Sequence, residues 1–307
     1  MLITVGGQTA SGKSALAVEL AHRLGGAAAA AIVSVDSMQL YRGLDVGTAK
    51  ISDEETRGIE HFQLDELEVA QEASVAVYQQ RARGNVETLL GENRTPIAVG
   101  GTGLYMRALI DEMEFPATDP QVRERWQQML NEEGAPALHQ QLARLDPAAA
   151  EQIHPNNGRR LVRALEAIEV TGRPFSATLP QYVYHYEPTI QFAIRWSNDE
   201  LDQRIAERTE MMFRPGGIVA ETETILASGQ QFGKTAARAT GYAEALAVLA
   251  GTMTVTEAID QVQLATRQLS RRQMKWFRRD PRIKWLEGDS LPRLADLAME
   301  TISRVAQ

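Results

Sequence analysis

The 307-residue chain has no cysteine, and it has no long run of uncharged apolar residues. The absence of cysteine excludes disulfides, thiolate metal sites and cysteine nucleophiles. The five histidines show no metal-ligand spacing, which argues against a structural zinc site. A membrane-spanning helix needs about 18 or more apolar residues in succession, and the N-terminus lacks a signal-peptide pattern. We therefore expect a cytoplasmic protein without a membrane partner.

The chain carries 40 acidic and 32 basic side chains, and their distribution is uneven. Between Arg267 and Lys284 there are eight basic residues and one acid. An evenly acidic surface would disfavour nucleic acid as a partner, whereas a local basic face favours it. The hydrophobic fraction of 44% is enough for the core of one large domain or two modest ones.

Short apolar runs alternate with segments of helical periodicity, which predicts an α/β fold with a parallel sheet flanked by helices on both faces. Strands are expected at Leu2–Val5, Ala30–Val35, Pro96–Val99, Gln191–Trp196 and Ile283–Leu286. The main helices of this part are expected at Ser14–Leu24, Ala70–Leu90, after Gly103, at Asp199–Met212 and over most of the C-terminal region.

One loop between a predicted strand and a predicted helix has a phosphate-binding pattern. The residues Gly7-Gln8-Thr9-Ala10-Ser11-Gly12-Lys13-Ser14 match G-x-x-x-x-G-K-[ST], the P-loop of nucleotide-binding and ATP-binding proteins. In such a loop backbone N–H groups converge on phosphate oxygens, Lys13 adds a positive charge and Ser14 can ligate Mg²⁺. The pattern does not identify the phosphate compound.

The pattern changes between Phe115 and Glu187, where helical segments rich in Arg, Gln and Glu are separated by Pro and Gly. We interpret this part as a mainly helical insertion domain. The predicted organisation is a P-loop-type core formed by residues 1–114 and 190–307, with an insertion of residues 115–189.

Asp36 follows the second predicted strand, whose carboxyl end should share a crevice with the P-loop. Three roles are open for its carboxylate at this point. It could ligate magnesium, it could act as a base or acceptor for the nucleophile of a second substrate, or it could cap the following turn.

Three long motifs occur in order along the chain: the P-loop, residues Asp36–Lys50 (DSMQLYRGLDVGTAK) and residues Val99–Tyr105 (VGGTGLY). In these motifs the chain resembles the bacterial tRNA dimethylallyltransferase family, also called tRNA isopentenyltransferases. The resemblance continues through Arg159–Glu166, Thr171-Gly172, Arg204-Ile205 with Arg208, Gly241-Tyr242 with Glu244, and Thr266–Arg278. Among the departures, Gln8 stands where the family usually has proline, and Ser14 where threonine is commoner.

The resemblance implies transfer of a dimethylallyl group from dimethylallyl diphosphate to N6 of the adenosine 3′ of the anticodon in tRNA, with release of diphosphate. The P-loop, Gly7 to Ser14, would then hold diphosphate, and Mg²⁺ would be a cofactor bound by Ser14. The implied catalytic residues are Asp36, Ser14 and Arg208, with Asp36 as the base that orients the N6 amine. We expect a monomer whose partners are dimethylallyl diphosphate and the anticodon stem-loop of tRNA.

A base in an anticodon loop must leave its stack, so the enzyme needs a surface that holds the flanking backbone. By family position, tRNA contacts are predicted at Asp36, Ser37, Met38, Gln39, Thr102, Arg123, Arg159, Arg160, Leu161, Val162, Arg163, Arg271, Arg272, Lys275 and Arg278. Arg204, four residues before Arg208, could also reach the diphosphate. Solvated faces are the ordinary alternative for the arginines, and core packing is the interpretation that we favour for Trp276 and Phe277.

Two other functions compete with the transferase. A small-molecule P-loop kinase would share the loop and the acidic residue, but it needs neither the Asp36–Lys50 segment nor a basic C-terminal helix. A non-catalytic RNA-binding module with a vestigial P-loop would have no need of Lys13, Ser14 and Asp36, all of which are present.

Overall fold

The computed structural model describes residues 1–178 and 182–305, and the chain divides into two compact units. We call them the core unit, Met1–Ile110 with Tyr184–Gln307, and the helical unit, Asp111–Val183. In the part of the chain that the structure describes, no helix is long and apolar enough to cross a membrane.

The unit boundaries lie a few residues earlier than the expected 115 and 190. The chain re-enters the core unit at Tyr184. There the side chains of Tyr184 and Tyr186 pack against a buried cluster of that unit. The segment just before the fifth strand therefore belongs to the core unit and not to the insertion.

The core unit is built on a six-stranded sheet in the order β3-β2-β4-β1-β5-β6, and every strand pair is parallel. The strands are β1 (Leu2–Gly7), β2 (Ala30–Ser34), β3 (His61–Phe62), β4 (Thr95–Val99), β5 (Thr189–Arg195) and β6 (Lys284–Glu287). The expected strands and the parallel α/β architecture are confirmed, and the two-residue β3 was missed because it is too short for a periodic signal.

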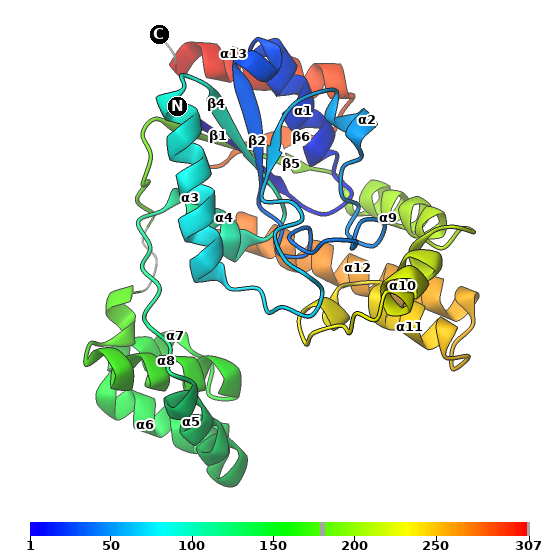
Figure 1. Ribbon diagram of the computed structural model, residues 1–307. Coiled ribbons are helices and arrows are strands. Elements are labelled where there is room, and N and C mark those ends of the chain that lie inside the picture. The colour runs from blue at the N-terminus through cyan, green and yellow to red at the C-terminus, as the bar shows by residue number, and fades with distance from the viewer. Residues whose placement is uncertain (179–181, 306–307) are drawn as a thin grey trace. The chain divides into compact units, whose positions relative to one another are not determined.

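Alternate side chains of the strands enter two different cores. Ile3 and Val5 of β1 face the cluster that contains α1 (Lys13–Arg23) and α13 (Leu291–Val305). Leu2 faces the opposite cluster, which contains α3 (Val75–Gly91) and α4 (Gly103–Ile110). Figure 1 shows these helices on the two faces of the sheet. Burial on both faces explains why the strands are nearly continuous apolar runs.

The carboxyl edge of the sheet carries the loops that follow β1, β2 and β4, and it is covered by a helical layer (Figure 1). This layer consists of α9 (Asn198–Met212), α10 (Ile218–Ala227), α11 (Tyr242–Leu249) and α12 (Val255–Phe277). A third buried cluster, which includes Tyr41, Ile218 and Tyr242, joins these helices to the loop after β2. The short α2 (Asp53–Thr56) lies within that same connection between β2 and β3.

The helical unit contains α5 (Pro120–Glu133), α6 (Ala135–Leu145), α7 (Pro147–Gln152) and α8 (Gly158–Thr171). Side-chain caps mark the N-termini of α5, α7 and α8, where the capping residues are Asp119, Asp146 and Asn157. One face of α6 and one face of α8 form its core, in which Leu138, Leu142 and Leu165 are fully buried.

Candidate active site

The loop after β1 has the backbone of a phosphate-binding turn. Gly7 and Gly12 have φ values of +128° and +88°, a region that favours glycine, and a Cβ at Gly7 would lie 3.1 Å from the carbonyl oxygen of Ile194. α1 begins directly afterwards at Lys13, and no side chain of the described residues caps its first turn. The free N–H groups of this helix end, together with the helix dipole, favour an anion.

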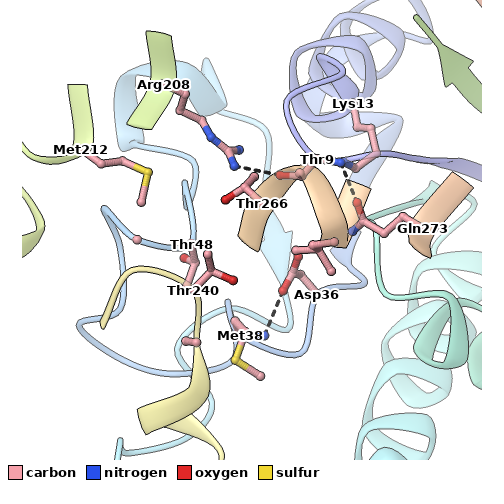
Figure 2. A pocket seen from close by; sticks show the side chains of 13 residues that line it. Thr9, Lys13, Asp36, Met38, Thr48, Arg208, Met212, Thr240, Thr266 and Gln273 are labelled. Atoms are coloured by element: carbon pink, nitrogen blue, oxygen red, sulfur yellow. Dashed lines mark hydrogen bonds between the residues drawn. The ribbon is translucent and has the colours of Figure 1, made fainter. Parts of the chain in front are cut away.

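Lys13, Asp36 and Arg208 come together in one pocket beside this loop (Figure 2). The Lys13 ammonium donates a hydrogen bond of 2.7 Å to the carbonyl oxygen of Gln8. Burial lowers the pKa of Lys13 to about 8; Asp36 opposes this shift, and the positive charge of Arg208 adds to it. Two cations beside a single carboxylate give the pocket a net attraction for a phosphate compound.

Asp36 occupies the position that its sequence predicts, at the carboxyl end of β2. Its Oδ1 accepts a hydrogen bond of 2.9 Å from the backbone N–H of Met38, so the carboxylate caps the turn while it lines the pocket (Figure 2). Burial raises the pKa of Asp36 above the ordinary value for an aspartate, against the effect of the Met38 hydrogen bond and of Lys13. The shift makes the carboxylate a better proton acceptor.

Arg208 reaches the P-loop from α9, and its Nη2 donates a hydrogen bond of 2.9 Å to the hydroxyl of Thr9 (Figure 2). Burial lowers the pKa of Arg208, whereas the nearby Asp36 raises it. Arg204 does not join it, because its guanidinium lies 4.0 Å from the ring centre of Trp196. The expectation that both arginines could reach the phosphate site was therefore wrong for Arg204.

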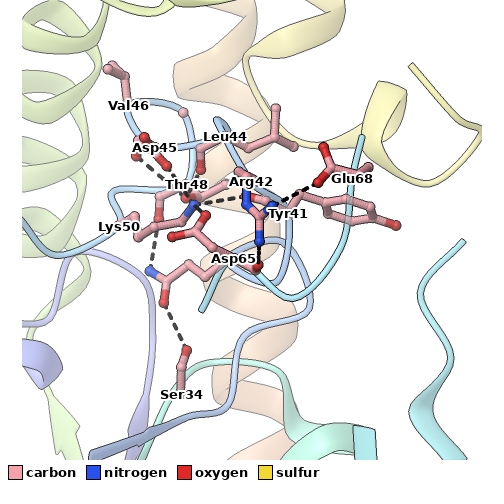
Figure 3. Close-up of polar contacts among 12 residues, drawn as sticks. Ser34, Tyr41, Arg42, Leu44, Asp45, Val46, Thr48, Lys50, Asp65 and Glu68 are labelled. Carbon is pink, nitrogen blue, oxygen red and sulfur yellow. Dashed lines mark hydrogen bonds and ion pairs between the residues drawn. The ribbon is translucent and has the colours of Figure 1, made fainter. Parts of the chain in front are cut away.

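The segment after Asp36 forms a hydrogen-bonded wall of the pocket (Figure 3). The nearly buried ammonium of Lys50 binds the carboxylates of Asp45 and Asp65 and donates 2.8 Å to the carbonyl oxygen of Tyr41. The Gln39 amide donates to the carbonyl oxygens of Thr48 and Ala49. These contacts hold the loop so that Met38, Gly47 and Thr48 face the pocket.

Tyr242, which the sequence offered only as part of a family motif, and Glu221, which it did not single out, hold the same wall on the side away from the pocket. The Tyr242 hydroxyl accepts 3.2 Å from the Gly47 N–H and donates 2.5 Å to Glu221. The second carboxylate oxygen of Glu221 accepts from the N–H groups of Asp45 and Val46. The Gly241-Tyr242 motif was the available signal for Tyr242, whereas Glu221 lies in an ordinary helical pattern.

The P-loop is also held by contacts with Ser270 and Trp196, and a further contact joins the second motif to the third. Gln8 does not face the pocket: its amide donates 2.7 Å to the hydroxyl of Ser270 on α12. The indole N–H of Trp196 donates 3.0 Å to the carbonyl oxygen of Ser11. The hydroxyl of Thr102, in the turn before α4, accepts 3.3 Å from the N–H of Ser37, which ties the second and third motifs together.

The predicted basic face on α12 is exposed in the core unit. Arg271, Arg272, Lys275 and Arg278 are all exposed, and Arg271 also lies 3.5 Å from the carboxylate of Asp202. Phe277, by contrast, is buried, and Trp276 packs against the same small cluster. The expectation that these two aromatics belong to the core is confirmed.

In the helical unit the predicted tRNA contacts separate into three kinds. Arg159 and Arg160 are exposed. Arg123 and Arg163 both bind the carboxylate of Glu166, whose side chain has no exposed surface. Leu161 and Val162, finally, are buried, so in this structure their side chains offer no surface to tRNA. Their places in the helical period of α8 turn them toward α6.

The oxygen atoms around the P-loop suit Mg²⁺. The exposed Ser14 and the carboxylate of Asp36 line the same pocket, and Mg²⁺ prefers such hard oxygen ligands, completed by substrate phosphates and water. Within residues 1–178 and 182–305 we find no group of three or more acidic, histidine or cysteine side chains that could hold a metal by itself. A site that depends on the phosphate substrate fits these residues.

A model of the "IPP transferase" family matches residues 39–280 of the chain. The tRNA dimethylallyltransferase of Thermobifida fusca (strain YX) is 50% identical over 302 residues, which are 98% of this chain and 94% of that protein. Its counterpart from Streptomyces coelicolor is 50% identical over 299 residues, 96% and 94% of the two chains.

Solved structures agree with these sequence relatives. The tRNA Δ²-isopentenylpyrophosphate transferase of Staphylococcus epidermidis has a TM-score of 0.72 at 31% identity and covers 99% of each chain. The tRNA isopentenylpyrophosphate transferase of Bacillus halodurans has a TM-score of 0.70 at 32% identity, covering 99% of this chain and 96% of that one. A eukaryotic dimethylallyltransferase acting on tRNA has the same fold, with a TM-score of 0.80 at 23% identity.

Proposed function

The chain belongs to the IPP transferase family, and from this premise we propose that it transfers a dimethylallyl group from dimethylallyl diphosphate to N6 of the adenosine 3′ of the anticodon in tRNA. The class of the enzyme, a transferase that prenylates tRNA, follows from its relatives. The observation that carries the finer proposal is the pocket in which Lys13 and Arg208 face Asp36.

This pocket is lined by both charged and apolar side chains. Lys13, Arg208 and the N-terminus of α1 suit the diphosphate, while Met38, Met212 and Leu269 offer an apolar surface. A dimethylallyl group would lie against that surface with its diphosphate on the P-loop. A nucleotide needs a base-binding site beyond the phosphates, whereas an allylic diphosphate needs a small apolar one.

Transfer requires one bond to break and one to form. The bond between the allylic carbon and the diphosphate oxygen breaks, and its electron pair leaves with the diphosphate. The N6 lone pair forms the new carbon–nitrogen bond, and the carboxylate of Asp36 takes the N6 proton. Lys13 and Arg208 stabilise the negative charge that develops on the leaving group.

Mg²⁺ would be held by Ser14 together with the diphosphate and water, and it would supply further neutralisation of the leaving group. The residues of the chain retain separate tasks. Ser14 contributes a hydroxyl at the start of α1, and Asp36 is held in place by the Met38 N–H, which leaves its second oxygen for the substrate.

The exposed cations of α12 are the proposed contact for the tRNA backbone. Arg272, Lys275 and Arg278 lie on the side of the helix that faces solvent, while Ser270 and Gln273 on the same helix contact the P-loop. Phosphate contacts of this kind position a nucleic acid without reading its sequence. The tRNA would thus be held by the helix that also supports the P-loop. We call the P-loop together with Lys13 and Arg208, which would bind dimethylallyl diphosphate, the donor site.

The proposal is tested with purified protein, Mg²⁺ and unmodified tRNA, to which labelled dimethylallyl diphosphate or γ-labelled ATP is added in parallel. We expect prenyl label on the tRNA, none with Lys13→Ala, and full transfer with Lys234→Ala, an exposed lysine away from the pocket. Mapping the label by nuclease digestion identifies the adenosine. Phosphate transfer from ATP without prenyl transfer would replace the proposal with a kinase.

A further inference from the structure

We propose that Gln273 is a positioning residue of the donor site, which sets the P-loop and, through Thr9, the guanidinium of Arg208. The inference rests on the proposed function for its kinetic consequence. Its structural basis is the side-chain amide of Gln273, which projects from α12 toward the pocket (Figure 2).

The Gln273 amide connects two separate motifs of the chain. Its Oε1 accepts a hydrogen bond of 2.7 Å from the backbone N–H of Thr9, in the P-loop. Its Nε2 donates 3.1 Å to the carbonyl oxygen of Gly101, in the turn after β4. Because the acceptor and the donor are both used, the amide has one orientation that satisfies its partners.

Gly101 gives independent support, because the absence of a side chain at this position leaves room for the Gln273 amide. A Cβ on Gly101 would lie 2.3 Å from Nε2 and 3.2 Å from Cδ of Gln273, far inside van der Waals contact. No positive φ requires glycine at this position. The second glycine of the Gly-Gly-Thr-Gly turn is therefore explained by the close approach of Gln273.

Thr9 passes this constraint to Arg208. Its N–H is held by Gln273, and its hydroxyl accepts the 2.9 Å hydrogen bond from Arg208 Nη2. The Nε of Arg208 is buried, and it has no hydrogen-bond partner among the residues that the structure describes. The Thr9 hydroxyl is thus a principal anchor of the guanidinium, and a shift of Thr9 would move the group that faces the leaving diphosphate.

Gln273 acts through other residues and touches no reacting atom in this scheme. The adjacent contact of Gln8 with Ser270 anchors the loop to the same helix, but from its outer side. Both contacts belong to α12, so the helix that carries the exposed cations Arg272 and Lys275 also determines the shape of the donor site. A misplacement of about 1 Å in such a support can lower a rate on the order of a hundredfold.

The first test is Gln273→Met, which keeps the length of the side chain and removes both hydrogen bonds. We expect kcat/KM for dimethylallyl diphosphate to fall on the order of tenfold to a hundredfold. Binding of inorganic diphosphate, measured by calorimetry, should weaken, while the Kd for tRNA stays within about twofold, a difference of about 0.4 kcal/mol. Gln261→Met, an exposed glutamine on the same helix, is the matched control and should behave as the wild type.

The second test is Gly101→Ala, which displaces the Gln273 amide while leaving the residue in place. It should reproduce the kinetic defect of Gln273→Met, and the double variant should be no worse than either single variant, since both remove the same contact. Additive losses would mean that the two residues act separately, and they would overturn the inference.

A purely structural role for Gln273 predicts a lower melting temperature with kcat/KM and diphosphate binding unchanged below it, and that result would also overturn the inference. Failure of the proposed function is distinguished by the wild type. If wild-type protein transfers no prenyl group, the function is wrong, whereas diphosphate binding still tests the role of Gln273.

Discussion

Arg208 and Thr9 are joined by a hydrogen bond of 2.9 Å although 199 residues separate them in the sequence. The contact brings α9 against the loop after β1, and it selects one of two arginines on the same helix. Arg204 stacks on Trp196 instead, and the Trp196 indole in turn binds the carbonyl oxygen of Ser11. Arg208 thus faces the pocket, whereas Arg204 packs against Trp196, which holds the P-loop.

Arg208→Lys should lower kcat on the order of a hundredfold, because a lysine cannot hold Thr9 and the diphosphate at once. Steady-state kinetics with tRNA at saturation measure this loss. Arg214→Lys, an exposed arginine just after α9, is the control and should change kcat less than twofold. Equal rates for the wild type and the Arg208 variant would remove Arg208 from the donor site.

Asp36→Asn should lower kcat by about 10²–10⁴-fold, which is the range for loss of a general base. The amide can still accept from the Met38 N–H, so the turn should remain folded and tRNA binding should persist. Filter binding of tRNA and single-turnover transfer measure the two effects separately. A variant that transfers at the wild-type rate would leave Asp36 with the role of a turn cap.

The rate should fall on the alkaline side, with an inflection near the pKa of about 8 for Lys13. Below this pKa the ammonium is charged and attracts the diphosphate; above it the proton is lost and kcat/KM declines as pH rises, since kcat/KM reports the free enzyme. Lys13→Arg should lack this inflection, because a guanidinium stays charged throughout the range. Identical alkaline limbs in both proteins would assign the inflection to another group.

Arg272→Ala should weaken tRNA binding and reduce the slope of log K against log salt by about one, as expected for the loss of one phosphate contact. Arg271→Ala should have a smaller effect, since Asp202 already lies 3.5 Å from that guanidinium. The control is Arg304→Ala on α13, which should leave the slope unchanged. A slope that does not respond to Arg272 would separate α12 from tRNA binding.

Glu166→Gln should destabilise the helical unit by about 2 kcal/mol, because its buried carboxylate accepts from Arg123 and Arg163 and from the N–H of Asp119. Hydrogen exchange of the amides in α5 and α8 measures the local loss. Glu169, the partner of Arg125, is more exposed than Glu166, and Glu169→Gln should cost less than about 1 kcal/mol of unfolding free energy. Similar costs for both variants would show that burial of Glu166 does not matter.

The element order could be predicted because it depends on local patterns. β1 and β2 are short apolar runs, and α1 and α8 have helical periods with caps or turn residues at their ends. Elements too short for a periodic pattern could not be predicted: β3 has two residues and α7 has six, and both were missed. Side-chain direction on α8 was not available from the motif either, since Leu161 and Val162 follow exposed arginines in the sequence but face the core.

The sequence by itself determined the P-loop, the position of Asp36 at the end of its strand and the family, because each is a matter of residue type and spacing along a continuous segment. Only the tertiary structure decided which distant side chains meet these motifs. It is Arg208 and not Arg204 that contacts Thr9, and Gln273 that binds the Thr9 N–H. Likewise, Glu221 accepts from the Tyr242 hydroxyl that binds the Gly47 N–H. Such contacts depend on how the helices pack over the edge of the sheet. Helical spacing alone does not distinguish among several residues on a helix that could make the same contact.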